Sequence, residues 1–318
     1  MYKVFVDGQE GTTGLQIRER LLGHAGIELL EIQPEKRKDP EARQSLLNKA
    51  DVAFLCLPDA AAKESVSLVH NNTTRIIDAS TAHRTDPRWT YGLPELNKQQ
   101  RSRIKKSLRV CVPGCHATGF NLLMYPLVTG GFVPADHPVT CHSVTGYSGG
   151  GKKLIAVYEG PDTGSKGLEA PRHYALSLSH KHLPEMQKIS GLAAPPIFTP
   201  IAGGFYKGMA VFIPLFCSLL HNKPTARDIH GYLASYYASE RFVDVYAFDP
   251  DARLNNGFFN PLEANNTNRN DIFVFGGEER MLLVSRLDNL GKGASGAAVQ
   301  NMNIMLGFDE STGLEPPG

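Results

Sequence analysis

Residues Tyr2 to Leu22 read YKVFVDGQEGTTGLQIRERLL, which is a short β-rich run, a glycine-containing turn and a segment with helical spacing. Apolar side chains recur one turn apart at Ile17 and Leu21, as in an amphipathic helix. A strand, a glycine turn and a helix in this order are typical of the start of a dinucleotide-binding fold. This stretch therefore predicts that the first domain continues as alternating strands and helices.

The same alternation continues along the first third of the chain. Further strands are predicted at residues 27–32, 52–57 and 75–79, with helices at 42–49 and 60–70 between them. The run at 52–57 is continuously apolar, as in a parallel strand that is covered on both faces. The pattern predicts an α/β protein with a Rossmann-type doubly wound parallel sheet.

The second half of the chain has a different character. Strands are predicted at residues 139–144, 210–215, 272–274 and 281–286, separated by long loops rich in glycine, proline and asparagine. They predict a second, α+β domain with a mixed or antiparallel sheet. We expect a nucleotide-binding domain at 1–114, completed by residues 290–318 with a buried helix at 292–306, and a catalytic domain at 115–289.

Composition and charge argue against several kinds of partner. The chain has 318 residues, with 33 Lys and Arg against 32 Asp and Glu, so we expect a small-molecule substrate and no nucleic acid. No apolar run approaches the roughly 18 residues of a membrane helix, and no signal peptide is evident, which predicts a cytoplasmic protein without membrane contact. The five cysteines lack paired CxxC spacing, so we expect reduced thiols and no metal.

One cysteine lies at a predicted junction of strand, turn and helix. Residues 110–119 read VCVPGCHATG, in which a β-rich run and a Pro-Gly turn precede helix-forming residues. Cys115 is therefore expected at or just inside a helix N-terminus, where backbone N–H groups favour a thiolate and can hold an oxyanion. This position predicts a nucleophile. The alternative is a small buried side chain that closes the turn.

The glycines after the first strand form the pattern G-x-x-G-x-x-G. Gly8, Gly11 and Gly14 make a spaced variant of the dinucleotide fingerprint G-x-G-x-x-G. Such glycines bring backbone N–H groups against a pyrophosphate at a helix N-terminus, and Thr12 and Thr13 can add hydroxyl donors. The pattern predicts a dinucleotide cofactor.

A basic cluster follows the second predicted strand. Lys36, Arg37 and Lys38 are suited to the 2′-phosphate of NADP(H), which we favour over NAD. Glu31 and Glu35 lie in the same segment, and a carboxylate there can accept a hydrogen bond from the ribose of NAD. NAD and a solvated charged loop therefore stay open as alternatives.

Two histidines in the second half carry potential proton-transfer chemistry. His180 and His182 lie in SHKHLPEM, a spacing that places both rings on one side of an extended segment. Imidazole titrates near neutral pH, so either ring can act as a general acid or base. Zinc binding is the rival interpretation, and it lacks a clear third ligand.

A loop with anion-binding potential is predicted at residues 143–153, which read SVTGYSGGGKK. Its hydroxyl, backbone N–H and ammonium groups suit a carboxylate or a phosphate, while a flexible structural turn is the alternative. A P-loop is excluded, because Lys153 stands where a magnesium-binding Ser or Thr is required.

Together these motifs make the chain resemble the N-acetyl-gamma-glutamyl-phosphate reductases in their shorter form, within a larger group that includes the aspartate-semialdehyde dehydrogenases. The motifs are G-x-x-G-x-x-G at 8–14, YGLPE at 91–95, PGCHAT at 113–118, GYSG at 146–149, HKHLPE at 180–185 and NLGKGA at 289–294. The chain departs from the longer form at His116, where tyrosine is frequent, and at Lys152, near a frequent arginine.

The resemblance implies an NADPH-dependent reduction of N-acetyl-L-glutamyl 5-phosphate to the 5-semialdehyde and phosphate, in arginine biosynthesis, through a thioester on Cys115. It places the acid/base role on His180, with His182 as the neighbouring candidate. Further contacts are expected to the substrate from Arg84, Ser148 and Gly149, and to the cofactor from Cys56, Pro58, Asn289 and Gly291. Enzymes of this size commonly form homo-oligomers, here a dimer or a tetramer.

Two alternatives to this activity stay open. The first is a related acyl-phosphate reductase that acts on aspartyl phosphate or on a carrier-linked aminoadipyl phosphate. The aspartate enzymes usually have an asparagine directly before the cysteine, where this chain has Gly114. The second is a catalytically inactive, nucleotide-sensing homologue.

Overall fold

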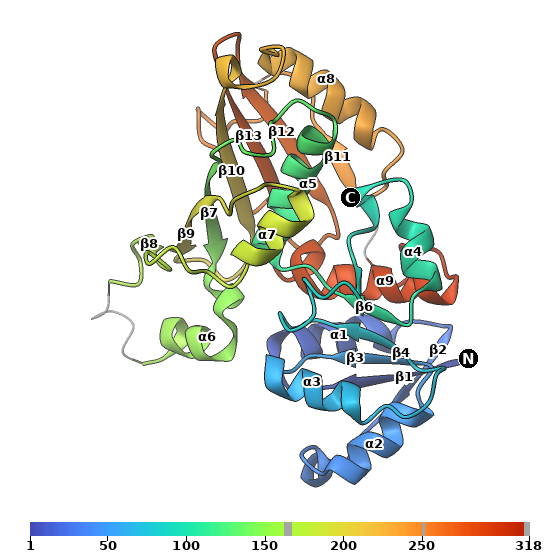
Figure 1. The fold of residues 1–318 in the computed structure, drawn as a ribbon. Helices are drawn as coiled ribbons and strands as arrows, with labels where there is room; N and C mark the ends of the chain where they lie inside the picture. The colour runs from blue at the N-terminus through green and yellow to red at the C-terminus, as the bar shows by residue number, and fades with distance from the viewer. Residues whose placement is uncertain (162–166, 250–251, 315–318) are drawn as a thin grey trace. The chain divides into compact units, whose positions relative to one another are not determined.

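The computed structural model describes residues 1–161, 167–249 and 252–314 (Figure 1). The chain divides into two compact units, one formed by Met1–Gly114 with Ala294–Gly318 and the other by Cys115–Gly293. Each unit is built around its own sheet. Residues 315–318, the end of the predicted C-terminal segment, lie outside the described residues.

The first unit contains a six-stranded sheet in the order β2-β1-β3-β4-β6-β5, and all its strand pairs are parallel. Its strands are β1 Tyr2–Asp7, β2 Ile27–Leu30, β3 Val52–Leu55, β4 Arg75–Asp78, β5 Thr90–Tyr91 and β6 Arg109–Cys111. Its helices are α1 Thr12–Leu22, α2 Pro40–Lys49, α3 Asp59–Ser67, α4 Gln100–Lys106 and α9 Gly296–Leu306, with short 3-10 turns η1 Pro34–Lys36 and η2 Pro94–Leu96. The Rossmann-type prediction is confirmed.

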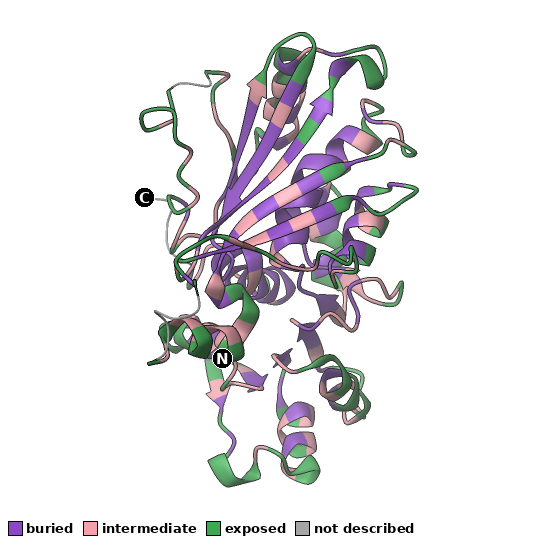
Figure 2. Cartoon of the chain, turned by 90° about the vertical axis from the view of Figure 1, so that its left-hand side faces the viewer, coloured by how far each residue is buried: buried purple, intermediate pink, exposed green. Residues whose placement is uncertain are grey.

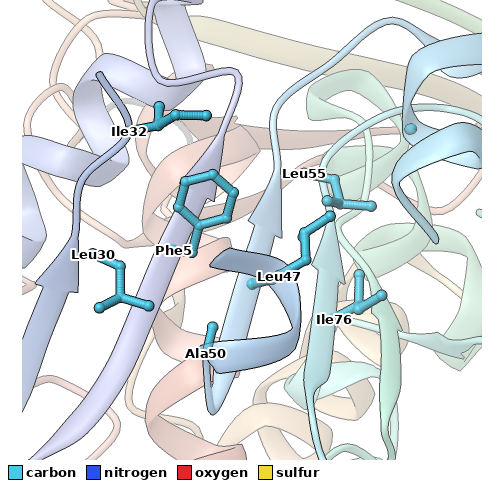
Figure 3. Close-up of a cluster of buried hydrophobic side chains, with 9 residues drawn as sticks. Phe5, Leu30, Ile32, Leu47, Ala50, Leu55 and Ile76 are labelled. Carbon is cyan, nitrogen blue, oxygen red and sulfur yellow. The ribbon is translucent and has the colours of Figure 1, made fainter. Parts of the chain in front are cut away.

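One face of this sheet is covered by an apolar cluster, drawn in Figure 3. Phe5, Leu55 and Ile76 come from adjacent strands, and Leu47 of α2 lies against them fully buried. Burying each such side chain contributes about 1.5 to 3 kcal/mol, so the cluster fixes α2 to the sheet. Because the strands are parallel, their carboxyl ends meet at one edge, where the glycine turn follows β1.

The C-terminal helix α9 belongs to the first unit through buried polar contacts. Asn301 Nδ2 donates to the carbonyl of Gly92 at 2.9 Å, and Gln300 Nε2 donates to Glu95 at 2.8 Å. Buried amides of this kind need partners, and these two hydrogen bonds attach the helix to the segment at 91–95. A π-helical turn, η6 Gly291–Ser295, precedes α9 within the range predicted as one helix.

The second unit contains a seven-stranded sheet in the order β11-β12-β13-β10-β7-β9-β8. Its strands are β7 Thr140–Gly146, β8 Arg172–His173, β9 Ile197–Gly203, β10 Met209–Phe216, β11 Val243–Val245, β12 Asn270–Gly276 and β13 Arg280–Leu287. The pairs β7 with β9 and β11 with β12 are parallel, and the others are antiparallel, so the predicted mixed sheet is confirmed. Buried residues alternate with more exposed ones along several of these strands (Figure 2).

The helices of this unit are α5 Cys115–Thr129, α6 Gly151–Glu159, α7 Leu183–Ser190 and α8 Ala226–Tyr237, with 3-10 turns η3 Tyr147–Gly150 and η5 Cys217–Leu219. The flexible loop expected at 143–153 is wrong, because β7 continues to Gly146 and α6 begins at Gly151. Strand β9 was missed, because Pro200 interrupts its pattern, yet Pro200 pairs with Ser143 inside the sheet.

Helix α5 is packed closely against the sheet. A side chain added at Gly119 would lie 2.8 Å from Val211 Cγ2 and 2.9 Å from Ser285 Oγ, so glycine is required for this approach. Most of the helix is buried, and α7 also packs against it. The residues at the start of α5 are therefore held on a rigid support.

Candidate active site

Cys115 is the first residue of α5, which confirms the predicted helix start. Its side chain is partly exposed, whereas Cys111, Cys141 and Cys217 are buried. Burial raises the pKa of the Cys141 thiol and of the Cys217 thiol, so neither is a thiolate at neutral pH. The backbone N–H groups of the first helical turn favour an anion at Cys115.

Cys56, the remaining cysteine, directly follows β3 in the first unit. Burial raises the pKa of its thiol strongly, and the charges of Asp78 and Asp7 raise it further. Its backbone N–H donates to the carbonyl of Asp7 at 2.8 Å, beside the glycine turn. Cys56 is therefore suited to lining a binding site as a neutral thiol. It is not suited to nucleophilic attack.

Three histidine rings meet in the second unit. The rings of His180 and His182 have centroids 4.7 Å apart, and each lies 5.5 Å from the ring of His116. The expected extended segment is wrong, because His182 has helical backbone angles and directly precedes α7. The turn brings both rings together and lets the His182 N–H donate to His180 Nδ1 at 3.1 Å.

His116 follows Cys115 on α5 and is buried with a hydrogen bond at each ring nitrogen. Nδ1 lies 3.0 Å from Ser143 Oγ, and Nε2 lies 2.9 Å from the hydroxyl of Tyr174. Burial lowers the pKa of His116 to about 3, assisted by the charges of His180 and Lys181, so the ring is neutral at physiological pH.

Tyr174 comes after β8 and is partly buried. Burial raises the pKa of its hydroxyl, and the charge of Cys115 raises it further, so the phenol stays protonated. Tyr174 was not predicted as a site residue, Ser143 was included only as the first residue of the loop at 143–153, and His116 was noted only as a departure from the longer form. The one signal in the sequence was the position of His116 directly after the nucleophile.

Gly293 approaches the nucleophile from the C-terminal end of the second unit. A side chain added there would place its Cβ 2.7 Å from the Cβ of Cys115. At Gly291, an added Cβ would lie 2.4 Å from the carbonyl oxygen of Thr267, so packing within the unit explains this glycine. Gly293 belongs to the motif at 289–294, but its position beside the nucleophile was not predicted.

Ser148, Gly149 and Asn289 come together in the second unit. Asn289 Nδ2 donates to Ser148 Oγ at 3.0 Å, and Asn289 Oδ1 accepts from the backbone N–H of Gly208 at 2.8 Å. A side chain at Gly149 would lie 3.7 Å from Asn289 Nδ2. Asn289 therefore orients the Ser148 hydroxyl.

The three glycines of the turn after β1 differ in how much space surrounds them. Gly8 has φ +88°, and an added Cβ would lie 2.4 Å from the carbonyl oxygen of Cys56. At Gly14 the added Cβ would lie 2.5 Å from the carbonyl oxygen of Gly8. At Gly11, which caps α1, the nearest atoms are 3.5 and 3.6 Å away. The fold requires Gly8 and Gly14, whereas Gly11 has room for a side chain at the helix N-terminus, where a pyrophosphate is expected.

This difference predicts separate effects for two substitutions. Gly11→Ala should change the free energy of unfolding by less than about 1 kcal/mol. It should weaken NADPH binding at least about tenfold, because the added methyl group would keep the pyrophosphate away from the backbone N–H groups, and losing one hydrogen bond to a charged group costs about 1.5 to 3 kcal/mol. Gly14→Ala, the matched control, should cost about 2 kcal/mol or more of stability. Urea unfolding and a fluorescence titration with NADPH measure the two effects, and full NADPH affinity in Gly11→Ala would contradict the assignment.

Other predicted residues of the first unit lie near the carboxyl ends of its strands. Thr12 and Thr13 begin α1, and Pro58 caps α3. Arg37 Nη1 lies 3.0 Å from Glu10 Oε1, which joins the basic cluster to the glycine turn, and Lys36 is exposed. Arg84 is the exception among the cations, because it is buried.

Arg84 donates to backbone carbonyls in the first unit. Its Nε donates to Val112 at 2.9 Å and its Nη2 to Ala79 at 3.1 Å. These carbonyls follow β6 and β4, so the guanidinium braces the ends of both strands. A substrate contact from Arg84 stays a prediction.

Two further properties concern only the described residues. No helix in this part of the chain is long and apolar enough to cross a membrane. No group of three or more His, Cys, Asp or Glu side chains there is arranged to hold a metal ion.

The model of the semialdehyde dehydrogenase NAD-binding domain matches residues 3–104, and the model of the semialdehyde dehydrogenase dimerisation domain matches residues 115–289. These matches place the chain among the semialdehyde dehydrogenases. Aspartate semialdehyde dehydrogenase II from Vibrio cholerae, complexed with ASA, has a TM-score of 0.68 at 13% identity, covering 96% of this chain and 98% of that one. The enzyme from Candida albicans, solved with NADP, has a TM-score of 0.63 at 16% identity, with the same coverage.

Curated relatives narrow the class. N-acetyl-gamma-glutamyl-phosphate reductase from Trichormus variabilis is 49% identical over 318 residues, covering 98% of this chain and 99% of the relative. N-acetyl-gamma-glutamyl-phosphate reductase 2 from Pseudomonas putida is 45% identical over 312 residues, covering 98% of each. The chain belongs to the N-acetyl-gamma-glutamyl-phosphate reductase family. It is an oxidoreductase with a domain that binds a pyridine nucleotide.

Proposed function

We propose that the protein reduces N-acetyl-L-glutamyl 5-phosphate to N-acetyl-L-glutamate 5-semialdehyde and phosphate, with NADPH as the reductant, in arginine biosynthesis. The observation that carries this proposal is a partly exposed cysteine at the start of α5, followed directly by His116 of the histidine cluster, in a chain 49% identical to the Trichormus variabilis reductase. A thiol at a helix N-terminus with imidazoles nearby suits acyl transfer through a thioester.

The first half of the reaction transfers the acyl group to Cys115. The sulfur forms a bond to the carbonyl carbon of the acyl phosphate, and the carbonyl oxygen becomes an oxyanion that the N–H groups at the start of α5 stabilise. The bond between this carbon and the phosphate oxygen then breaks, so phosphate leaves and a thioester remains. The thiol proton passes to a histidine of the cluster.

The second half releases the aldehyde. When bound, NADPH supplies the hydride that adds to the thioester carbon. The resulting thiohemiacetal loses its bond to sulfur, the carbonyl reforms, and the histidine returns a proton to the sulfur. No further oxidant or reductant is needed.

The hydrogen bond between the two neighbouring histidines divides their roles. Because His180 Nδ1 accepts from the His182 backbone, a neutral His180 carries its proton on Nε2. His180 then serves as a donor to the substrate, and His182 takes the role of proton acceptor. This assignment gives the acid/base role to His182, the neighbouring candidate, in place of His180.

The remaining contacts are proposed as the sequence predicts them. Gly8, Gly11 and Gly14, with Thr12 and Thr13, hold the pyrophosphate, and Lys36 and Arg37 hold the 2′-phosphate of NADP(H). Cys56, Pro58, Asn289 and Gly291 border the cofactor, while Arg84, Ser148 and Gly149 contact the substrate. The NADP in the Candida albicans structure supports this cofactor.

The position of Arg37 predicts the cofactor preference. Arg37→Ala should raise KM for NADPH about 10- to 100-fold, the value of one charge-assisted contact to phosphate, and leave KM for NADH unchanged. Arg88→Ala is the matched control, because this exposed arginine pairs with Asp86 at 2.6 Å and is not part of the basic cluster at 36–38. Steady-state rates with both cofactors give the result. An unchanged NADPH to NADH preference would remove Arg37 from the 2′-phosphate site.

The proposed activity is tested in the reverse direction. Phosphate-dependent reduction of NADP and NAD is measured with N-acetylglutamate semialdehyde, aspartate semialdehyde and an aminoadipate semialdehyde. Turnover with the first aldehyde and NADP supports the proposal. Turnover with another aldehyde would assign the related reductase. The nucleotide-sensing alternative would be favoured by two results together: no turnover with any aldehyde, and a Cys115 thiol that reacts with iodoacetamide no faster than a model thiol.

We propose a cytoplasmic homo-oligomer, a dimer or a tetramer, with residues 1–114 and 290–318 binding NADP(H) and residues 115–289 binding substrate. The match to a dimerisation domain supports self-association. All five cysteines are free thiols, as a reducing compartment favours. Light scattering on the purified protein distinguishes the two assemblies.

A further inference from the structure

His116, Ser143 and Tyr174 form a buried hydrogen-bonded chain that the steps above do not use. Ser143 is fully buried on β7, and His116 is 3% exposed on α5. The two hydrogen bonds of His116, at 3.0 and 2.9 Å, connect Ser143 on one side with Tyr174 on the other. Three separate elements of the second unit therefore converge on one imidazole.

The packing around His116 fixes the plane of its ring. The ring of Phe198 lies 5.1 Å away, and the rings of His180 and His182 each lie 5.5 Å away. A side chain enclosed in this way keeps one rotamer. Its two hydrogen bonds therefore have fixed directions.

A neutral imidazole has one donor nitrogen and one acceptor nitrogen. When Ser143 donates to Nδ1, the ring proton lies on Nε2 and is donated to the oxygen of Tyr174. Tyr174 then keeps its own proton for a second partner. Tyr174 is hydrogen-bonded to His116, which directly follows Cys115 on α5, so the second partner of its hydroxyl lies on the side of the chain where negative charge develops during attack by the sulfur.

We propose that Tyr174 is a further catalytic residue, which donates a hydrogen bond to the oxyanion formed when Cys115 attacks a carbonyl, and that His116 and Ser143 are positioning residues that aim its hydroxyl. This inference rests on the thioester chemistry proposed above. The carbonyl electrons move to oxygen as the bond between carbon and sulfur forms, and they return when the leaving group departs. Tyr174 keeps its proton throughout, so no acid, base or redox partner is added.

The test uses an activated ester, so that it does not depend on the natural substrate. p-Nitrophenyl acetate acylates Cys115 through a tetrahedral oxyanion, and the burst of nitrophenolate gives the rate. Iodoacetamide alkylates the same sulfur without a carbonyl oxyanion. Tyr174→Phe should slow acylation by about 10- to 100-fold, as loss of one oxyanion donor does, and leave the alkylation rate within about twofold.

A double-mutant cycle tests the positioning role. Ser143→Ala should slow acylation by about three- to tenfold in the parent protein and have no effect in the Tyr174→Phe background, because the two residues act as one unit. His116→Gln, whose amide can still donate to Tyr174, should retain more acylation activity than His116→Phe. Additive losses, or equal losses in acylation and alkylation, would overturn the proposal.

The matched control is Tyr158→Phe in α6. The Tyr158 hydroxyl is buried and has no hydrogen-bond partner among the described residues. This variant should acylate at the parent rate. A parent that shows the ester burst but does not reduce N-acetylglutamyl phosphate would contradict the proposed function, while the comparison of Tyr174→Phe with the parent still decides the role of Tyr174.

Discussion

Replacing Cys115 with alanine should reduce acyl-phosphate reduction by at least about 10⁴-fold, because no other group in the proposed mechanism forms the thioester. The fold should survive, since the side chain is partly exposed and alanine is a good helix former at the start of α5. The assay is phosphate-dependent reduction of NADP with N-acetylglutamate semialdehyde. Mass spectrometry of the parent enzyme, quenched with acyl phosphate in the absence of NADPH, should show an N-acetylglutamyl adduct that the variant lacks.

Cys217 provides the matched control for this experiment. It also begins a helical turn, η5, but it is buried, and burial with the charge of Glu279 raises the pKa of its thiol. Cys217→Ala should therefore retain the parent rate and form the same adduct. Full activity in Cys115→Ala would contradict the thioester mechanism. Loss of activity in Cys217→Ala at unchanged stability would show that a buried cysteine is also needed for activity, and the exposed position of Cys115 would then not explain its role.

Replacing Gly293 with alanine should lower kcat by about 100-fold, although the residue has no reactive group. The added methyl carbon would stand 2.7 Å from the Cβ of Cys115 and 3.2 Å from the carbonyl oxygen of Asp288. One of these neighbours has to move, and a shift of the nucleophile by about 1 Å costs roughly two orders of magnitude in rate. KM for the semialdehyde should change much less than kcat.

The control for this prediction is Gly231→Ala in α8, where an added Cβ has no neighbour within 4 Å. This variant should keep the parent rate and gain up to about 1 kcal/mol of stability, because alanine favours the helix. Thermal unfolding separates a displaced nucleophile from a damaged fold. If Gly293→Ala retains the parent kcat, the close approach to Cys115 has no catalytic consequence.

The first sheet could be predicted because its signals are local. The run at 52–57 is apolar throughout, and the glycines after Asp7 mark the turn into α1. Both depend on residues that are neighbours in the chain. The same reason explains the placement of Cys115, because the Pro-Gly turn before it and the apolar helix after it are adjacent in sequence.

The chain from Ser143 to Tyr174 could not be predicted, because it depends on contacts between distant segments. Ser143 and His116 are 27 positions apart, and His116 and Tyr174 are 58 apart. No motif connects them, and they are brought together by the pairing of β7 and β8 with β9 and by the packing of α5 on the sheet. Strand β9 was not predicted, because Pro200 interrupts its pattern. The sequence therefore did not indicate that Ser143 and the strand directly before Tyr174 lie on one sheet.

The assignment of α9 to the first unit has a consequence for the order of events on the ribosome. The segment at 91–95 emerges early, but the amides of Gln300 and Asn301 that bond to it are synthesised about 200 residues later. The second unit is one continuous segment, residues 115–293, so it can complete its fold before α9 has been synthesised. The first unit thus begins to emerge first but completes its fold last. A protein truncated before α9 should depend on chaperones to keep its nucleotide-binding sheet soluble.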